Sequence, residues 1–218
     1  MTNNKLLQKY RNFSPATKAS FWFVVSNVML RGILFITLPI FSRILTPSEY
    51  GVVSLFSSWE TIISIFCTLT LWGGVLNIVL VKHGAERDKY IAAFQGLATT
   101  LTLTFFIITL IFIKPFSKFS TLSPFLIVCM YIQILSQTPF FIWQGKQRFD
   151  YKYKLIVIIS IIISILNPIL GYIAVINTEY KAEARIVVGV ILNLIIGLLF
   201  FIINIKKGKF FFNKSIWK

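Results

Sequence analysis

VVSLFSSWETIISIFCTLTLWGGVLNIVLV, residues 52–81, is a stretch of 30 residues in which Glu60 is the one charged side chain. The earlier stretch ASFWFVVSNVMLRGILFITLPIF, residues 19–41, has 23 residues and also one charge, Arg31. A bilayer core about 30 Å thick is crossed by roughly 20 apolar residues. An ionised side chain at that depth is costly unless it faces protein or water. Both stretches therefore predict membrane-spanning helices, and their charges indicate the inside of a bundle.

The composition of the whole chain is typical of a multi-pass membrane protein. Of its 218 residues, 56% are hydrophobic and 13% are charged, whereas about 25% of the residues in a soluble domain are charged. We predict an all-α membrane fold with one six-helix transmembrane lobe, residues 19–205, between an N-terminal segment, 1–18, and a basic tail, 206–218. The six spans are predicted at residues 19–41, 52–81, 91–113, 124–143, 155–176 and 186–205.

The net charge of +15 is distributed as a membrane topology requires. If the N-terminus is cytoplasmic, sixteen of the 22 lysines and arginines lie in inside segments and five in outside segments, with Arg31 in the membrane. The positive-inside rule then predicts that both termini are cytoplasmic. We interpret the basic excess as topology and contact with anionic membrane lipid, not as a nucleic-acid surface. The five outside cations are Arg43, Lys114, Lys118, Lys181 and Arg185.

Five spans carry polar residues at helical spacing. We interpret the serines and threonines among them as interhelical hydrogen bonds. For Arg31 and Glu60 two interpretations stay open, an ion pair within the bundle or a role facing a substrate or an ion. The candidates for a translocation cavity are Arg31, Glu60, Asn27, Gln95, Gln133, Gln137 and Asn167.

The sixth span has a different pattern, with Gly189, Asn193 and Gly197 at intervals of four residues. Small residues at this spacing let two helices approach closely, so we expect a packing face on which Asn193 bonds a neighbouring helix. In the second span, the Trp72-Gly73-Gly74 element is expected to break the helix and leave 75–81 as an interfacial extension.

Other residue types predict no catalytic or metal chemistry. Cys67 and Cys129 both lie in spans and are expected to pack as small apolar side chains. His83, in the turn KHGAERDKY (82–90), is expected to be an ordinary solvated loop residue. There is no glycine-rich phosphate loop, Cys/His cluster or pair of catalytic carboxylates. We therefore expect no enzyme and no cofactor, apart from a possible coupling ion, H⁺ or Na⁺.

Three connecting segments resemble a known family. RILTPSEYGVVSLF (43–56) joins the first two spans, and we expect Thr46-Pro47 to end one helix and Ser48 to cap the next. This segment, the basic loop WQGKQRFDYKYK (143–154) and the closing KSIWK (214–218) resemble Wzx-type polysaccharide-repeat, or O-antigen, flippases. These proteins belong to the multidrug/oligosaccharidyl-lipid/polysaccharide exporter superfamily.

The resemblance implies a fold of two six-helix lobes around a cavity, of which this chain is the N-terminal lobe. A second lobe or a second copy would then close the cavity. The implied function is movement of undecaprenyl-diphosphate-linked oligosaccharide across the bacterial inner membrane for O-antigen or capsule synthesis, with polysaccharide polymerase machinery as a possible partner. Arg31 would bind the diphosphate or an acidic sugar, and Glu60 would pair with Arg31 or carry the coupling ion.

Two alternatives differ in class from this function. A multidrug or cation antiporter of the same superfamily would favour acidic cavity residues, whereas here a single acid lies in a span. A truncated, non-transporting membrane protein is the other alternative. An enzyme acting on lipid-linked sugar is disfavoured, because no polar loop is large enough to hold a glycosyl donor.

Overall fold

The fold is all-α in the computed structural model, which describes residues 13–84, 86–209 and 217 and contains no strand among them. The helices are α2 (Pro15–Ile44), α3 (Pro47–Thr68), α4 (Gly74–Lys82), α5 (Arg87–Ile111), α6 (Ile113–Ser120), α7 (Pro124–Phe149), α8 (Tyr153–Ile176) and α9 (Lys181–Gly208). Six of them are long and apolar enough to cross a membrane, namely α2, α3, α5, α7, α8 and α9. The predicted multi-pass all-α architecture is confirmed.

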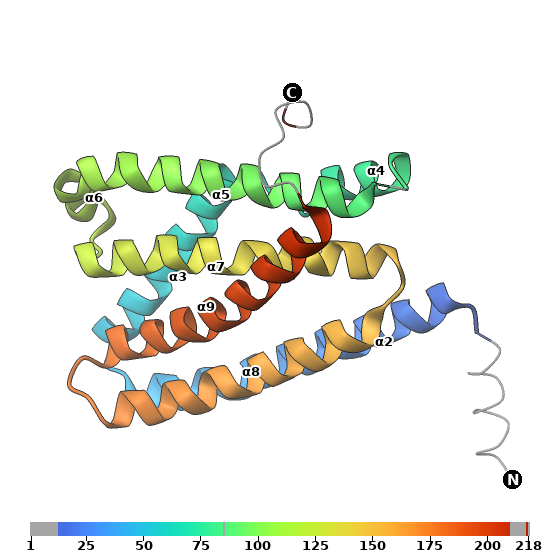
Figure 1. The fold of residues 1–218 in the computed structure, drawn as a ribbon. Coiled ribbons are helices and arrows are strands. Elements are labelled where there is room, and N and C mark those ends of the chain that lie inside the picture. The colour runs from blue at the N-terminus through green and yellow to red at the C-terminus, as the bar shows by residue number, and fades with distance from the viewer. Residues whose placement is uncertain (1–12, 85, 210–216, 218) are drawn as a thin grey trace, which may run out of the picture.

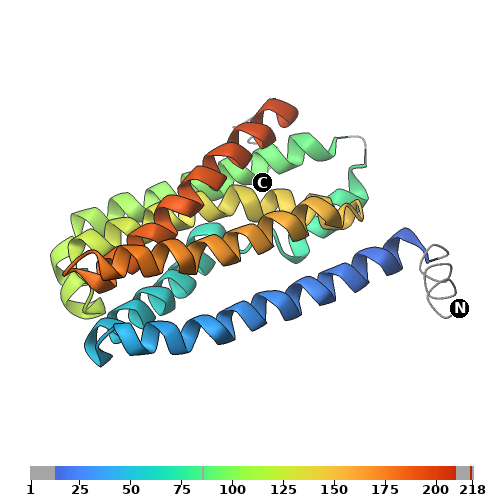
Figure 2. The ribbon, with the colours of Figure 1, turned by 90° about the horizontal axis from the view of Figure 1, so that it is seen from below.

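The long helices run back and forth between two ends of the bundle (Figure 1). The start of α2, the α4–α5 connection and the α7–α8 connection lie at the right end, and the α2–α3 and α8–α9 connections and α6 lie at the left. Helices α2 and α8 run side by side, as the view from below also shows (Figure 2). Helix α9 crosses obliquely and contacts α5, α7 and α8, while α3 crosses against α5, α7 and α9.

The α2–α3 connection is a capped turn between two helices. Thr46 is the N-cap of α3: its side chain accepts from the Glu49 backbone N–H at 3.3 Å, and the Glu49 carboxylate accepts from the Thr46 N–H at 2.7 Å. Pro47 occupies the first helical position, where no backbone donor is needed. The prediction that Ser48 is the cap is wrong by two residues, because Thr46 provides the hydroxyl and Ser48 already lies in the first turn.

The second predicted span is two helices. Helix α3 ends at Thr68, where Leu69 and Thr70 take the left-handed backbone conformation with φ of 50° and 48°, and α4 begins at Gly74. The expected break within this span is confirmed, but α3 ends four residues before the predicted Trp72-Gly73-Gly74 element. Helix α6 is absent from the sequence analysis, because its eight residues are too short for a span; Phe116 on it packs edge-to-face on Trp59 of α3 at 5.7 Å.

Helix α7 forms the core of the bundle and α2 its edge. In the most apolar 18-residue window of each helix, 61% of the α7 residues are buried against 6% of the α2 residues. Helix α2 packs mainly on α8, so much of its surface faces outward. Asn27 and Arg31 on α2 are exposed, whereas Ser26 is buried and Thr37 is half-buried.

Glycines permit the closest contacts of α9. A β-carbon on Gly197 would lie 2.1 Å from the Ser136 carbonyl oxygen of α7, and one on Gly208 would lie 2.3 Å from the Asp88 carbonyl oxygen of α5. Gly189 is buried, but its nearest neighbour would be Asn167 Nδ2 at 3.6 Å. Asn193 donates to the Gly189 carbonyl of its own helix at 2.9 Å. The expectation that Asn193 bonds a neighbouring helix is therefore wrong.

Candidate functional site

Arg31 and Glu60 do not form the ion pair that was one of their two interpretations. Neither side chain has a hydrogen-bond or ion-pair partner among residues 13–84, 86–209 and 217. Arg31 is exposed on α2, whereas Glu60 is half-buried on α3, on the stripe that also carries the buried Phe56 and Cys67. The pair fails because α2 packs on α8 while α3 turns its inner face to α5, α7 and α9.

Arg31 lies on the outward stripe of α2. Val24, Val28 and Phe35 share this face at helical spacing, and they are 62%, 66% and 76% exposed. Asn27 is also exposed. The structure therefore places two of the predicted cavity residues on the outer surface of this lobe.

Gln95 takes part in packing. It is fully buried, its Oε1 accepts from Asn204 Nδ2 at 2.7 Å, and its Nε2 donates to the Phe201 carbonyl at 3.3 Å. Asn204 Nδ2 also donates to the Pro139 carbonyl of α7 at 3.1 Å. This network joins α5, α7 and α9. Asn204 is not among the predicted candidates, because it lies at the end of the predicted sixth span.

A polar cavity of about 520 Å³ lies between α2, α7, α8 and α9. Gln137 and Asn167, two of the predicted candidates, line it, and Asn193 does so as well. Its size falls within the range of about 300–1,000 Å³ that is common for ligand sites. The other polar side chains on its wall are Thr37, Gln144, Arg148, Ser160, Ser164 and Arg185.

Arg185 is the cation at one end of this cavity. Its Nη1 donates to Asn167 Oδ1 at 2.6 Å, and its guanidinium carbon lies 4.6 Å from the centre of the Phe41 ring. The absence of a side chain on Gly171 makes room for it, since a β-carbon there would lie 3.0 Å from Arg185 Cδ. Arg185 is half-buried and has no carboxylate partner in the described parts of the chain.

Arg185 is not among the predicted cavity residues, because it precedes the predicted sixth span and was expected in an outside loop. Helix α9 begins at Lys181, so Arg185 lies inside its second turn. The sequence contains a pattern that places Arg185 on this helix, because the four-residue spacing of Gly189, Asn193 and Gly197 extends back by one step to Arg185.

Arg148 is the second cation on the cavity wall. It lies in the last turn of α7, and its guanidinium carbon is 5.5 Å from the centre of the Phe23 ring on α2. Gln144, one turn earlier, donates to Ser160 Oγ across the cavity at 3.5 Å. Among the described residues, no acidic side chain lines the cavity. Two cations and several neutral donors therefore favour an anionic ligand that also carries hydroxyl groups.

An apolar groove of about 450 Å³ adjoins the polar cavity. It is formed by α2 and α8 alone, and its walls include Ile36, Ile169 and Tyr172. Ile33, Thr37 and Pro168 line both the groove and the cavity. Single side chains therefore separate the polar cavity from the apolar groove.

Gln133 has an unusual environment on α7. Its Oε1 is buried and has no hydrogen-bond partner in the part of the chain that the structure describes. It lies one turn before Gln137 but does not line the cavity.

Most serines and threonines of the predicted stripes donate to carbonyls of their own helix, as Thr68, Thr102 and Ser136 do. Their interpretation as interhelical hydrogen bonds is therefore wrong for these residues, whereas it is confirmed for Ser160, which accepts from Gln144 of α7.

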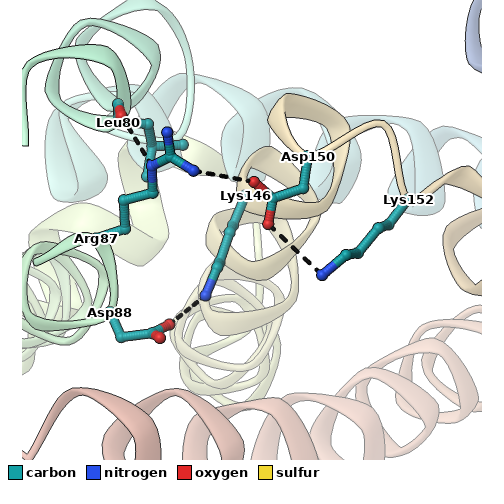
Figure 3. Close-up of polar contacts among 6 residues, drawn as sticks. All are labelled: Leu80, Arg87, Asp88, Lys146, Asp150 and Lys152. Atoms are coloured by element: carbon teal, nitrogen blue, oxygen red, sulfur yellow. Dashed lines mark hydrogen bonds and ion pairs between the residues drawn. The ribbon is translucent and has the colours of Figure 1, made fainter. Parts of the chain in front are cut away.

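An ionic cluster joins the two connections at the right end of the bundle (Figure 3). Arg87 pairs with Asp150 at 3.3 Å and donates to the Leu80 carbonyl at 3.0 Å, while Lys146 pairs with Asp88. Lys152 approaches Asp150 at 3.9 Å. These contacts connect α4, α5 and α7.

His83 is part of the same end of the bundle. Its ring stacks on Tyr90 at 4.3 Å, and Nδ1 lies 3.2 Å from the Tyr90 hydroxyl. The expected loop position is confirmed, since His83 lies in the turn after α4 and is partly exposed, and its contact with Tyr90 adds to that expectation. Neither His83 nor any other residue joins a group of three or more potential metal ligands within the described ranges.

The segment 214–218 that contributed to the family resemblance lies outside the described residues except for Trp217, whose indole N–H donates to the Ala93 carbonyl of α5 at 2.9 Å. No protein-family model matches the chain, and no curated protein or solved structure shows significant similarity to it.

Proposed function

We propose that this chain is a transport lobe that moves undecaprenyl-diphosphate-linked oligosaccharide across the bacterial inner membrane during O-antigen or capsule synthesis. The observation that carries the proposal is the cavity among membrane-spanning helices whose wall holds Arg148, Arg185 and neutral polar side chains. Arginine donates to phosphate through a planar fork, and amides and hydroxyls can bond sugar hydroxyls. The resemblance of the connecting segments supplies the identity of the substrate.

The same cavity disfavours a cation antiporter. A site for cationic substrates needs acidic side chains, and none of the described residues on this cavity's wall is acidic. Glu60 is the single acid near mid-span, and it lies on the face of α3 that carries Phe56 and Cys67. A role for Glu60 in coupling to H⁺ or Na⁺ remains part of the proposal.

The proposal includes a second lobe or a second copy of the chain. The outward stripe of α2 carries Asn27 and Arg31, which have no partner within the described ranges, and a covering lobe would remove these groups from lipid. Both termini are proposed to be cytoplasmic, with anionic lipid at the basic end and polysaccharide polymerase machinery as a possible partner. No enzymatic step is proposed.

Complementation of a strain that lacks its polysaccharide flippase tests the function. The 218-residue chain is compared with a version extended by a second six-helix lobe, and the membrane abundance of both is measured. Restored surface polysaccharide with the short chain means that one lobe suffices, as a dimer; restoration with the extended version alone means that the chain is half a transporter. If neither version restores polysaccharide at normal abundance, the proposal is refuted and the non-transporting alternative is favoured.

A matched pair of variants tests the cavity in the same strain. Arg185→Gln removes a cation from the cavity wall, while Arg43→Gln removes one from the exposed end of α2. We expect the first to lose surface polysaccharide and the second to retain it. Equal effects of both variants would mean that the cavity is not the transport site.

A further inference from the structure

We infer that Arg185 and the α2–α8 groove form one binding site for an amphiphile, with a phosphate-bearing head group on Arg185 and a hydrocarbon chain in the groove. This deepens the proposed function and rests on it only for the identity of the natural ligand. It also transfers the anion-binding role that the resemblance implied for Arg31 to a different residue on a different helix.

Arg185 has N–H donors that no described residue uses. A guanidinium has five N–H donors, and Arg185 uses one of them, toward Asn167. Its nearest other partner is the face of the Phe41 ring, which stabilises a cation but does not neutralise its charge. An arginine within a membrane helix usually pairs with an anion or with backbone carbonyls. In this chain that anion is not a carboxylate, because no ion pair to Arg185 exists among the described residues.

Arg185 is held in place before any ligand binds. Asn167 fixes one edge of the guanidinium, Phe41 covers one face, and the bare backbone of Gly171 accommodates the stem. A pre-positioned fork loses little side-chain freedom on binding, which favours recognition of a planar or tetrahedral anion over loose charge attraction.

The apolar groove lies next to Arg185 and Asn167. Phe41 and Pro168, which flank Arg185 and Asn167, also line the groove between α2 and α8. The groove wall contains hydrocarbon side chains such as Ile36 and Ile169, with Thr37 and the Tyr172 phenol as its polar members. The Thr37 hydroxyl is already used by the Ile33 carbonyl at 2.7 Å. The groove therefore suits an alkyl chain that leaves the head group at Arg185.

The rest of the polar cavity has further polar side chains on its wall. Arg148 lies eleven residues beyond Gln137 on α7, about 16 Å along the helix axis at 1.5 Å per residue. The wall between them offers Gln144, Ser160 and Ser164. In addition, Pro168 provides no backbone N–H, so the Ser164 carbonyl lacks its usual helical donor. A head group larger than phosphate, with hydroxyls, would meet both donors and acceptors there.

Binding is measured by native mass spectrometry of the full chain in a neutral detergent. The probes are dioleoyl phosphatidic acid, dioleoyl glycerol without the phosphate, and inorganic phosphate without the chains. We expect retention of phosphatidic acid and little retention of the other two, because the site needs both a head group and a chain. Equal retention of inorganic phosphate would show an anion site without a lipid, and equal retention of dioleoyl glycerol would show a groove without a head-group site; either result overturns the inference.

Matched variants locate the site. Arg185→Gln should weaken phosphatidic acid binding about tenfold or more, as expected for a charged hydrogen bond, while Arg43→Gln should leave it unchanged. Ile169→Trp should weaken binding by filling the groove, while Ile162→Trp, on the same helix and outside the groove, should not; both isoleucines are 50% exposed, so neither change burdens the core. Gel filtration and circular dichroism establish that each variant is folded.

The outcomes separate this inference from the proposed function. If Arg185→Gln binds phosphatidic acid as the wild type does, or if Arg43→Gln loses as much binding, the site is not at Arg185. Should Arg185→Gln prove unfolded, Ile169→Trp decides, since unchanged binding by that variant contradicts the inference by itself. If the variants behave as expected but complementation fails, the lipid site stands and the flippase function does not.

Discussion

Replacing Gly197 with alanine tests a close contact between α7 and α9. A β-carbon at this position would lie 2.1 Å from the Ser136 carbonyl oxygen and 2.7 Å from the carbonyl carbon. Ordinary van der Waals contact begins at 3.4 Å, so α7 and α9 must separate by about 1.3 Å at this point. The neighbour is backbone within a helix and cannot rotate away, so the whole interface must adjust.

The size of the effect follows from a comparison within the same helix. Gly189→Ala places a β-carbon 3.6 Å from Asn167 Nδ2, at the end of a side chain, and needs no rearrangement. Both changes gain the same helix propensity, so their difference isolates the overpacking at Gly197. We expect Gly197→Ala to be less stable than Gly189→Ala by about 1–3 kcal/mol.

The assay is unfolding of purified protein in mixed micelles with increasing sodium dodecyl sulfate, followed by far-ultraviolet circular dichroism. Gly51→Ala, which would meet nothing within 4 Å, serves as the control for alanine at an open position. Equal stability of the Gly197 and Gly189 variants would refute the close approach of α9 to α7. A low stability of the Gly51 variant would show instead that the helices respond to alanine itself.

Three further predictions use the same unfolding measurement. Arg31→Leu should change the free energy of unfolding by less than about 0.5 kcal/mol, because Arg31 has no partner in the described chain; a larger loss would reveal a contact of Arg31 within the lobe. Asn204→Leu should cost about 1–3 kcal/mol, since it leaves the buried Gln95 Oε1 without its donor, and Gln95→Leu in the same chain should restore part of that loss; a double variant that loses more than Asn204→Leu alone would contradict this. Exchanging the two charges, Asp88→Lys together with Lys146→Asp, should retain most of the roughly 0.2–1 kcal/mol of stability expected of a partly exposed ion pair. Each single change should lower the free energy of unfolding more than the exchange does, and salt should reduce this difference. Additive effects of the two changes would show that the pair contributes nothing.

The spans were predictable from the sequence because hydropathy is a local property of the chain. A helix that is apolar over 18 or more residues can be recognised from its sequence, whatever it packs against. The break in the second span was predicted from two adjacent glycines. Helix α6 escaped because its eight residues carry two lysines, Lys114 and Lys118, and resemble a polar loop. The bounds of α9 were short by five residues at its start, since Lys181 and Arg185 lower the local hydropathy without ending the helix.

The composition of the site depended on which helices pack together, and no local pattern contains that information. Arg31 and Glu60 have opposite charges and lie on consecutive helices, yet α2 packs on α8 and α3 on the other side of the bundle. Gln137 and Asn167 were selected as polar residues in spans, and they line the cavity because α7 and α8 both flank it. Gln95 met the same criterion and became a packing residue, because its partner Asn204 was not recognised.

Arg31 and Arg185 show why the depth of a charge and the direction it faces must be judged separately. Arg31 lies 13 residues from the end of α2 at Ile44 and 16 from its start at Pro15, about 20 Å and 24 Å along the helix. It is therefore near mid-span, where neither interface is close enough for the charge to reach water easily. Since its stripe is exposed and apolar, the cost must be relieved by something outside this lobe, such as the proposed second lobe or copy. The effect of Arg31→Ala on transport should then depend on that partner, whereas the effect of Arg185→Gln should depend on the ligand.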